Sequence, residues 1–345
     1  MLWRMRTPVG TSIVAVITAG DQRAAKAVYG ESKVHLELAG RPLVAHVVAA
    51  LQQVPEVSEV WVVGNAERLR GHLERDPVRG ELRKPLHVVP QFRNLFENAW
   101  QTFRRALPGA GPEGRDPAPE DLDQPVLYIS GDLPFVTPQE ISEFVRRSCE
   151  IECDYALGLT TEEAMRDFYP PAPGELGIRM AYFNLREGRF RHSNLHLVRP
   201  GRIGNRHYIE EMYEHRYQHE FRNAVALTWR LVRSEHGGLR MASFYCLLQL
   251  ASFMSRLGLR RGADVVRRFV PIIRVEQACS SLLRARFRCI VTEVGGCAVD
   301  IDNEADFDAA VARYGEWRAA QEERAKRLYG PLPLYLPERA GGEET

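Results

Sequence analysis

A glycine turn followed by spaced cationic residues lies near the start of the chain. Gly20 follows the apolar run 12–18, and Arg23, Lys26 and Lys33 come shortly afterwards. A glycine turn at the carboxyl end of a first parallel strand is where open α/β sheets bind phosphates, and nearby cations would neutralise a polyphosphate. The spacing matches neither G-x-G-x-x-G nor G-x-x-x-x-G-K-[ST], so a solvated basic loop stays the alternative.

Acidic residues follow two later apolar segments. Asp132 comes just after the run 126–130, which places it in the same crevice as the glycine turn. A carboxylate there could hold a Mg²⁺ ion that bridges phosphates, although an aspartate in a simple turn has the same pattern. Strand alternation would put Asp300 and Asp302 on one side of their segment, whereas Asp306 suits the first turn of the next helix.

Predicted strands and helices alternate through the first half of the chain and would position these residues. Apolar, β-branched runs predict buried strands at 12–18, 58–64, 86–89 and 126–130. Helical spacing of apolar residues predicts helices at 41–54, 65–73, 94–107 and 137–149. The alternation indicates an α/β fold with a three-layer, mostly parallel, Rossmann-like sheet.

The pattern changes after residue 160. A β-hairpin is predicted at 177–198, a helical region at 205–286, and a strand and a long helix at 288–294 and 304–328. We expect an α/β core formed by residues 1–160 plus 286–330, a hairpin and helical insertion at 161–285, and a tail at 331–345.

The insertion contains two segments of interest. Polar side chains alternate along 191–196, so Arg191 and Ser193 share one face, which either binds a phosphate or sugar or is simply exposed. Residues 241–259 are apolar but interrupted by Ser, Gln and Arg, which predicts a buried helix rather than a membrane span. The arginines that follow leave an interfacial helix on anionic lipid as the alternative.

The composition excludes several classes of protein. With 45% hydrophobic and 26% charged residues and a net charge of +1, the chain is neither disordered nor a basic nucleic-acid binder. Its six cysteines form no CxxC pair, which favours reduced thiols over zinc or disulfides. Charged residues follow the first apolar run at once, so we expect no signal peptide and a cytoplasmic protein. The oligomeric state is not indicated.

Three motifs in order resemble those of one enzyme family. They are an A-G-x-x-R…G-x-x-K loop with L-A-G-R-P-L after it, the strand end S-G-D-L-P at 130–134, and D-I-D-N-E-A-D-F at 300–307. Together they resemble the MobA-like NTP transferases, which are nucleotidyltransferases with a GT-A-like fold. The resemblance covers roughly 12–160 and 286–320 and does not extend to the insertion.

The resemblance implies a Mg²⁺-dependent transfer of NMP from an NTP, such as GTP or CTP, to a phosphorylated acceptor, with release of pyrophosphate. The acceptor would be a small molecule or lipid-linked, held by the insertion. Arg23 and Lys33 would be catalytic cations, and Asp132 and Asp302 would hold the metal. The residues implied in nucleotide binding are Ala19, Gly20, Asn65, Gln91, Asn94 and Asn98, with Gly64 beside them.

The chain also departs from the family pattern. Asp21 stands where a small residue is usual, and its carboxylate would repel a triphosphate unless it turns away. The long interval from Arg23 to Lys33 makes Lys26 a competitor for the lysine role. Two rival hypotheses follow. A GT-A glycosyltransferase would use the D-x-D of Asp300 and Asp302, and a non-catalytic nucleotide-binding protein would tolerate Asp21.

Overall fold

The computed structural model describes residues 12–21, 27–75, 77–206 and 267–332. Arg23, Lys26 and the segment 241–259 lie outside the described residues. Among the described residues, no helix has both the length and the apolar character needed to cross a membrane.

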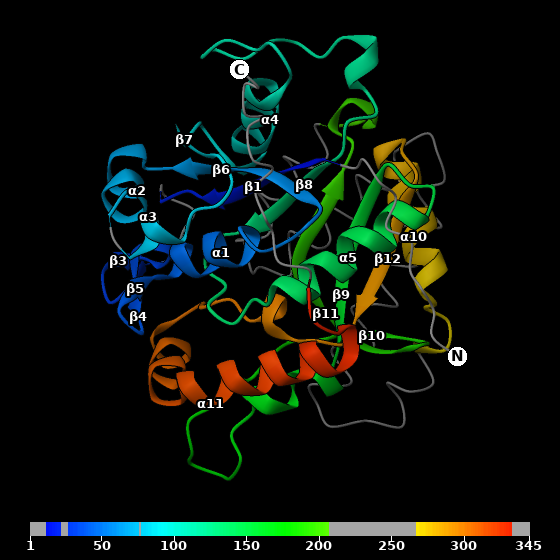
Figure 1. The fold of residues 1–345 in the computed structure, drawn as a ribbon. Coiled ribbons are helices and arrows are strands. Elements are labelled where there is room, and N and C mark those ends of the chain that lie inside the picture. The colour runs from blue at the N-terminus through cyan, green and yellow to red at the C-terminus, as the bar shows by residue number, and fades with distance from the viewer. Residues whose placement is uncertain (1–11, 22–26, 76, 207–266, 333–345) are drawn as a thin grey trace, which may run out of the picture.

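The centre of the molecule is a mixed, mostly parallel sheet of eight strands (Figure 1). Its order is β12-β9-β11-β8-β1-β6-β7, with β10 paired to β11. The strands are β1 (Ile13–Ala19), β6 (Val57–Gly64), β7 (Leu86–Pro90), β8 (Val126–Ser130), β9 (Tyr155–Thr161), β10 (Phe183–Leu185), β11 (Gly188–Val198) and β12 (Phe287–Thr292). Their arrangement confirms the predicted α/β class.

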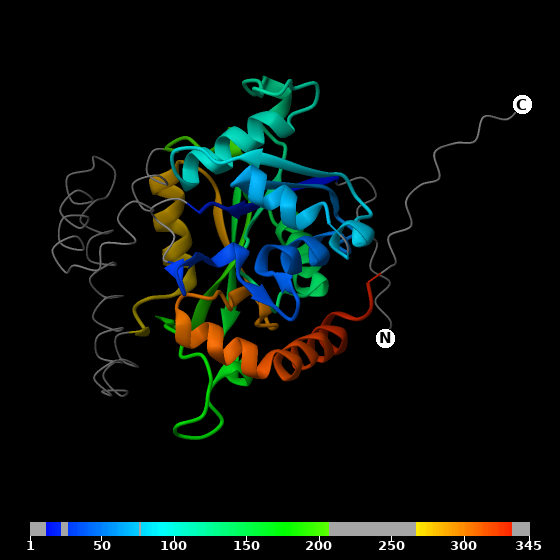
Figure 2. The same ribbon diagram turned by 90° about the vertical axis from the view of Figure 1, so that its left-hand side faces the viewer.

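Helices cover both faces of this sheet. On one face lie α1 (Leu43–Leu51) and α5 (Pro138–Glu150), and on the other lie α4 (Leu95–Ala106) and α10 (Ile272–Leu283). The short helices α2 (Ala66–Leu73) and α3 (Val78–Glu81) follow β6, and the long helix α11 (Glu304–Tyr329) runs along the bottom of both views (Figure 1, Figure 2).

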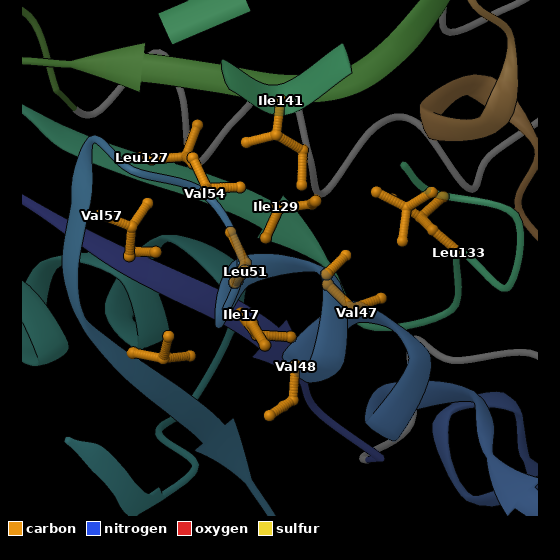
Figure 3. Packing of buried hydrophobic residues seen from close by; sticks show 14 of the residues in the cluster. Ile17, Val47, Val48, Leu51, Val54, Val57, Leu127, Ile129, Leu133 and Ile141 are labelled. Atoms are coloured by element: carbon orange, nitrogen blue, oxygen red, sulfur yellow. The ribbon is translucent and has the colours of Figure 1, made fainter. Parts of the chain in front are cut away.

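The largest core cluster fills the space between α1, α5 and the sheet. Figure 3 shows Val47 and Leu51 of α1 beside Ile17 and Ile129 of the central strands. Alternate residues of β1 point to opposite faces, so Ile17 joins this cluster whereas Val16 packs on the α4 side. Burial on both faces explains why these strands are continuous apolar runs.

The predicted hairpin forms, but its second strand belongs to the central sheet. β11 lies between β8 and β9 and is antiparallel to both, although its residues fall within the range 161–285 expected to be an insertion. α10, from the same range, packs on β12 and β9. The alternating polar residues of β11 left two interpretations open, a phosphate- or sugar-binding face and an exposed one. Several of them instead contact neighbouring elements, as the Tyr155 hydroxyl beside His196 Nδ1 at 2.8 Å illustrates.

A buried carboxylate joins α5 to the segment after β12. Glu140 is fully buried, and its oxygens accept hydrogen bonds from the Thr292 hydroxyl and the Cys297 backbone N–H, each at 3.0 Å. Burial outweighs these bonds and raises the pKa of Glu140 to about 7. Because the folded protein favours the protonated form, Glu140 makes stability fall as the pH rises from its unfolded pKa through about 7.

We expect Glu140→Gln to remove this pH dependence, because the amide keeps the shape of the side chain without its charge. At about 1.4 kcal/mol per pKa unit, the variant should gain about 3 kcal/mol on the wild type between pH 4.5 and pH 8. Urea unfolding at several pH values measures the difference, and Glu150→Gln at the exposed end of α5 is the matched control. A difference that does not vary with pH would contradict the assignment.

Candidate active site

The candidate site lies where β1, β6 and β8 end at the same edge of the sheet. The Gly131 N–H donates to the Thr18 carbonyl at 3.0 Å, which joins the ends of β8 and β1. A Cβ on Gly64 would stand 2.3 Å from the Ala19 carbonyl oxygen, so only glycine fits beside the turn. The carboxyl ends of parallel strands are thus drawn together at the edge where open α/β sheets bind ligands.

Asp132 is a buried carboxylate at this edge. The Ser130 hydroxyl donates to its Oδ1 at 2.5 Å, and Lys33 Nζ lies 3.9 Å from its Oδ2. Burial and the negative charge of Asp300 raise the pKa of Asp132, against the opposing charge of Lys33. A further cation that approaches the Asp132 carboxylate would stabilise its ionised form.

Two tight hairpins position Lys33. The first pairs β2 (Ala27–Val28) with β3 (Glu31–Ser32), and the second pairs β4 (Glu37–Leu38) with β5 (Arg41–Pro42). Both turns place two residues at positive φ: Tyr29 and Gly30 at 52° and 76°, and Ala39 and Gly40 at 53° and 77°. These values are typical of type I′ turns, so the A-G of the L-A-G-R-P-L motif is a hairpin turn.

Lys33 lies between the hairpins, in a short 3-10 helix, and links two carboxylates. Its Nζ donates to Asp302 Oδ1 at 2.6 Å and lies 3.9 Å from Asp132 Oδ2. Burial opposes the charge of Lys33, but Asp132 and Asp302 outweigh that effect and raise the pKa of the ammonium. Asp302 itself is 55% exposed. Residues from three distant parts of the chain therefore share one charged site.

The segment 299–303 is irregular rather than the expected strand, so strand alternation does not place its aspartates. Asp300 Oδ1 accepts a hydrogen bond from Arg191 at 2.7 Å, whereas Asp302 faces Lys33. Asn303 caps α11 by accepting from the Asp306 N–H at 3.0 Å, so Asp306 has the helix-start role predicted for it.

The Asp21 carboxylate accepts hydrogen bonds from two side-chain amides. Gln91 Nε2 donates to Oδ1 at 2.5 Å and Asn65 Nδ2 donates to Oδ2 at 3.1 Å, while the Asp21 N–H donates to Gln91 Oε1 at 3.0 Å. The nearby His35 ring is buried, which lowers its pKa to about 4, so it adds no positive charge at neutral pH. The two amides therefore stabilise the negative charge of Asp21 by hydrogen bonding.

The residues expected to contact the nucleotide divide into two groups. Gly20 is at the centre of the first, because a Cβ there would lie 3.3 Å from both Asn98 Nδ2 and Gln91 Oε1. Asn65 and Asn94 instead cap helices, accepting from the Arg68 N–H of α2 at 3.4 Å and the Glu97 N–H of α4 at 2.9 Å. The Asn-x-x-Glu spacing at 94–97 is a helix-start signal that the sequence analysis did not use.

The donor set fits a hard divalent cation. Asp132 and Asp302 both approach one ammonium group, so one cation can interact with both carboxylates at once. Across residues 12–21, 27–75, 77–206 and 267–332, no group of three or more His, Cys, Asp or Glu side chains is arranged to hold a metal ion. Two carboxylates suit Mg²⁺, which usually takes one or two protein carboxylates and fills its shell with water and phosphate oxygens.

Arg191 and Ser130 contact the site carboxylates but were not assigned to the site from the sequence. Arg191 was nominated only as a possible phosphate or sugar contact, and its ion pair with Asp300 links residues more than a hundred positions apart. Only the Ser-x-Asp spacing at 130–132 offered a local signal for the Ser130 hydrogen bond.

Parts of the chain resemble known proteins. A model of the MobA-like NTP transferase domain matches residues 15–172. The 2-C-methyl-D-erythritol 4-phosphate cytidylyltransferase of Chlorobium luteolum is 27% identical over 140 residues, which are 40% of this chain and 55% of that protein. The match therefore spans about half the length of that relative.

Among solved structures, a hypothetical transferase from Thermus thermophilus is similar with a TM-score of 0.51 and 22% identity, covering 86% of this chain and 99% of its own. That likeness concerns the fold. The stretch that the MobA-like NTP transferase domain model matches, residues 15–172, contains the glycine turn, Lys33 and Asp132.

Proposed function

We propose that this protein is a Mg²⁺-dependent nucleotidyltransferase. It would join an NMP unit from an NTP to a phosphorylated acceptor and release pyrophosphate. The observation that carries the proposal is the pairing of Lys33 with both Asp132 and Asp302. These residues lie at the edge of the sheet where β1 ends, just before Gly20. A cation flanked by two carboxylates supplies the charges that a phosphoryl-type displacement needs.

The side chains divide the work of the reaction. Gly20 has no side chain, so its backbone can approach the triphosphate. The Gln91 and Asn98 amides lie beside it. Lys33 neutralises charge on the phosphates and on the leaving pyrophosphate, and Arg23 is proposed to assist it. The protein holds the acceptor phosphate in line with the α-phosphorus, so catalysis rests on orientation and charge rather than a covalent intermediate.

Asp132 and Asp302 are the proposed ligands of Mg²⁺. When bound, the ion would supply positive charge that stabilises the negative charge developing during transfer. Ser130 keeps Asp132 oriented through its hydrogen bond to Oδ1. Lys33 and a divalent cation would compete for the same carboxylate oxygens, and the Lys33 ammonium could equally pair with phosphate oxygens.

The name of the Chlorobium relative supports a cytidine nucleotide and a phosphorylated alcohol as substrates of the present protein. We therefore propose CTP ahead of GTP and a phosphorylated small molecule ahead of a lipid-linked acceptor.

The test is to incubate the protein with Mg²⁺, each of the four NTPs and a panel of phosphorylated alcohols while monitoring pyrophosphate. We expect acceptor-dependent pyrophosphate release, with the NMP unit found in the product by mass spectrometry. Release of an NDP from nucleotide sugars would support the glycosyltransferase hypothesis instead. Nucleotide binding without turnover of any acceptor would favour the non-catalytic hypothesis.

We expect Asp132→Asn and Asp302→Asn each to lower kcat by at least about a hundredfold, because each removes a charge that stabilises the bound cation. Steady-state kinetics at saturating Mg²⁺ and thermal unfolding test the expectation together. Asp116→Asn is the matched control, since this aspartate is 87% exposed in the loop before β8. Near-normal kcat in both site variants would remove the metal assignment.

Lys33→Ala should weaken NTP binding by roughly tenfold or more, the usual cost of losing one charged hydrogen bond. Lys26→Ala should have a smaller effect, because Lys33 has the register set by the L-A-G-R-P-L hairpin and faces both carboxylates. Calorimetric titration of each variant with NTP compares them. A larger loss in the Lys26 variant would show that the lysine roles are exchanged.

A further inference from the structure

We propose that Arg191 is a positioning residue that fixes the segment carrying Asp300 and Asp302, so that Asp302 rather than Asp300 presents its carboxylate to the cation site. Asp300 then serves as the anchor of this segment rather than as a metal ligand. The inference rests on the proposed function for what the site binds, but the contacts that carry it do not depend on the reaction.

The guanidinium of Arg191 donates two hydrogen bonds to this segment. Its Nε donates to the Ala298 carbonyl at 2.6 Å, and its Nη2 donates to Asp300 Oδ1 at 2.7 Å. The ion pair is well shielded, with 18% of the Arg191 side chain and 12% of the Asp300 side chain exposed. A planar fork that bonds a carbonyl and a carboxylate together fixes orientation as well as position.

A β-bulge in β11, just after Arg191, supplies a further donor to the segment. The pairing of β11 with β9 shifts register between His192 and His196, and Asn194 lies at a φ of 53° within the shift. From this bulge, Asn194 Nδ2 donates to the Cys297 carbonyl at 3.3 Å. Bulges commonly redirect side chains at functional sites, and here one strand bonds Cys297, Ala298 and Asp300.

The bulge carries a local cost. The Ser193 hydroxyl is buried without a hydrogen-bond partner, and a Cβ on Gly158 would lie 2.0 Å from its oxygen. An unsatisfied buried hydroxyl is unfavourable, so other interactions of the bulged strand must offset its cost. The hydrogen bonds of Arg191 and Asn194 to the segment 297–300 are such interactions.

Two other elements hold the beginning of the same segment. Gln321 Oε1 of α11 accepts from the Gly295 N–H at 2.9 Å, and Glu140 of α5 accepts from the Cys297 N–H at 3.0 Å. A Cβ on Gly296 would lie 2.0 Å from the Phe135 carbonyl oxygen, so this backbone packs directly on the loop after Asp132. The segment is therefore fixed before Asp300.

The two aspartates consequently differ in kind. Asp300 is shielded and ion-paired with Arg191, whereas Asp302 is 55% exposed and is paired with the Lys33 ammonium. A cation that replaces Lys33 would meet Asp302 and Asp132. Arg191 thus sets which carboxylate of the Asp-Ile-Asp sequence faces the cation.

The experiment compares Arg191→Met, Arg191→Lys and Asp300→Asn, with Arg189→Met as matched control. Arg189 is on the same strand but bonds Glu162. Three readouts are used: Mn²⁺ binding by electron paramagnetic resonance without substrate, amide hydrogen exchange of 296–302 in metal-free protein, and the split between kcat and the KM for NTP.

We expect Arg191→Met to weaken Mn²⁺ binding and lower kcat by about tenfold or more, as loss of a residue that orients a metal ligand usually does. Its 296–302 amides should exchange faster, while the KM for NTP stays within about threefold. Arg191→Lys should recover part of each loss. Asp300→Asn should stay within about threefold of wild type in every readout, because the amide oxygen still accepts from Arg191.

Two results would overturn the inference. One is an Asp300→Asn variant as damaged as Asp302→Asn, which would make Asp300 a direct ligand. The other is wild-type exchange and Mn²⁺ binding in Arg191→Met. If that variant unfolds, the same readouts on Arg191→Lys decide. A wild type that transfers no nucleotide would reject the proposed function, whereas the exchange and Mn²⁺ measurements would still test Arg191.

Discussion

The contact of the Lys33 ammonium with Asp132 and Asp302 is the interaction around which the rest of the site is arranged. Burying a carboxylate such as Asp132 is unfavourable unless an opposite charge or a hydrogen-bond donor accompanies it. Lys33 and the Ser130 hydroxyl provide both. The surrounding structure must therefore bring together three chain segments that are distant in the sequence.

Each segment reaches the site by a different device. Two I′ hairpins fix Lys33, and the first is anchored to α11 by the Tyr29 hydroxyl, which donates to Asp308 Oδ1 at 2.8 Å. Asp132 follows directly from β8, while Asp302 depends on the backbone packing of Gly296 against Phe135. A hairpin, a strand end and a packed loop differ in rigidity, and Asp302, the most exposed of the three side chains, has the greatest freedom to adjust to a bound cation.

The sequence was sufficient for the parallel half of the fold, because strands buried on both faces leave continuous apolar runs and capped helices leave short polar signals. It was insufficient for β11. From strand alternation Arg191 was expected on a polar face that either binds a phosphate or sugar or is exposed, whereas Arg191 and Asn194 donate to backbone carbonyls more than a hundred residues away. The partners of Asp21 could not be predicted either, because Asn65 and Gln91 are distant from it in the sequence and approach it only in the fold. Asn65 and Asn94 each stand at the start of a predicted helix, a position typical of a cap, whereas the family resemblance implied nucleotide binding for both.

The environments of Asp300 and Asp302 also bear on the choice between the two transferase hypotheses. A D-x-D sequence suggests a pair of carboxylates that act together on one cation. Here the first carboxylate is bound by a guanidinium that simultaneously holds the Ala298 carbonyl, so releasing it would break two shielded hydrogen bonds. Breaking such a shielded pair is costly because it leaves a charge without its partner. The second carboxylate is exposed and shares Lys33 with Asp132, on a different strand of the sheet edge. The arrangement thus places Asp302 and Asp132 beside the same ammonium group, whereas Asp300, the other aspartate of the Asp-Ile-Asp sequence, is bound by Arg191.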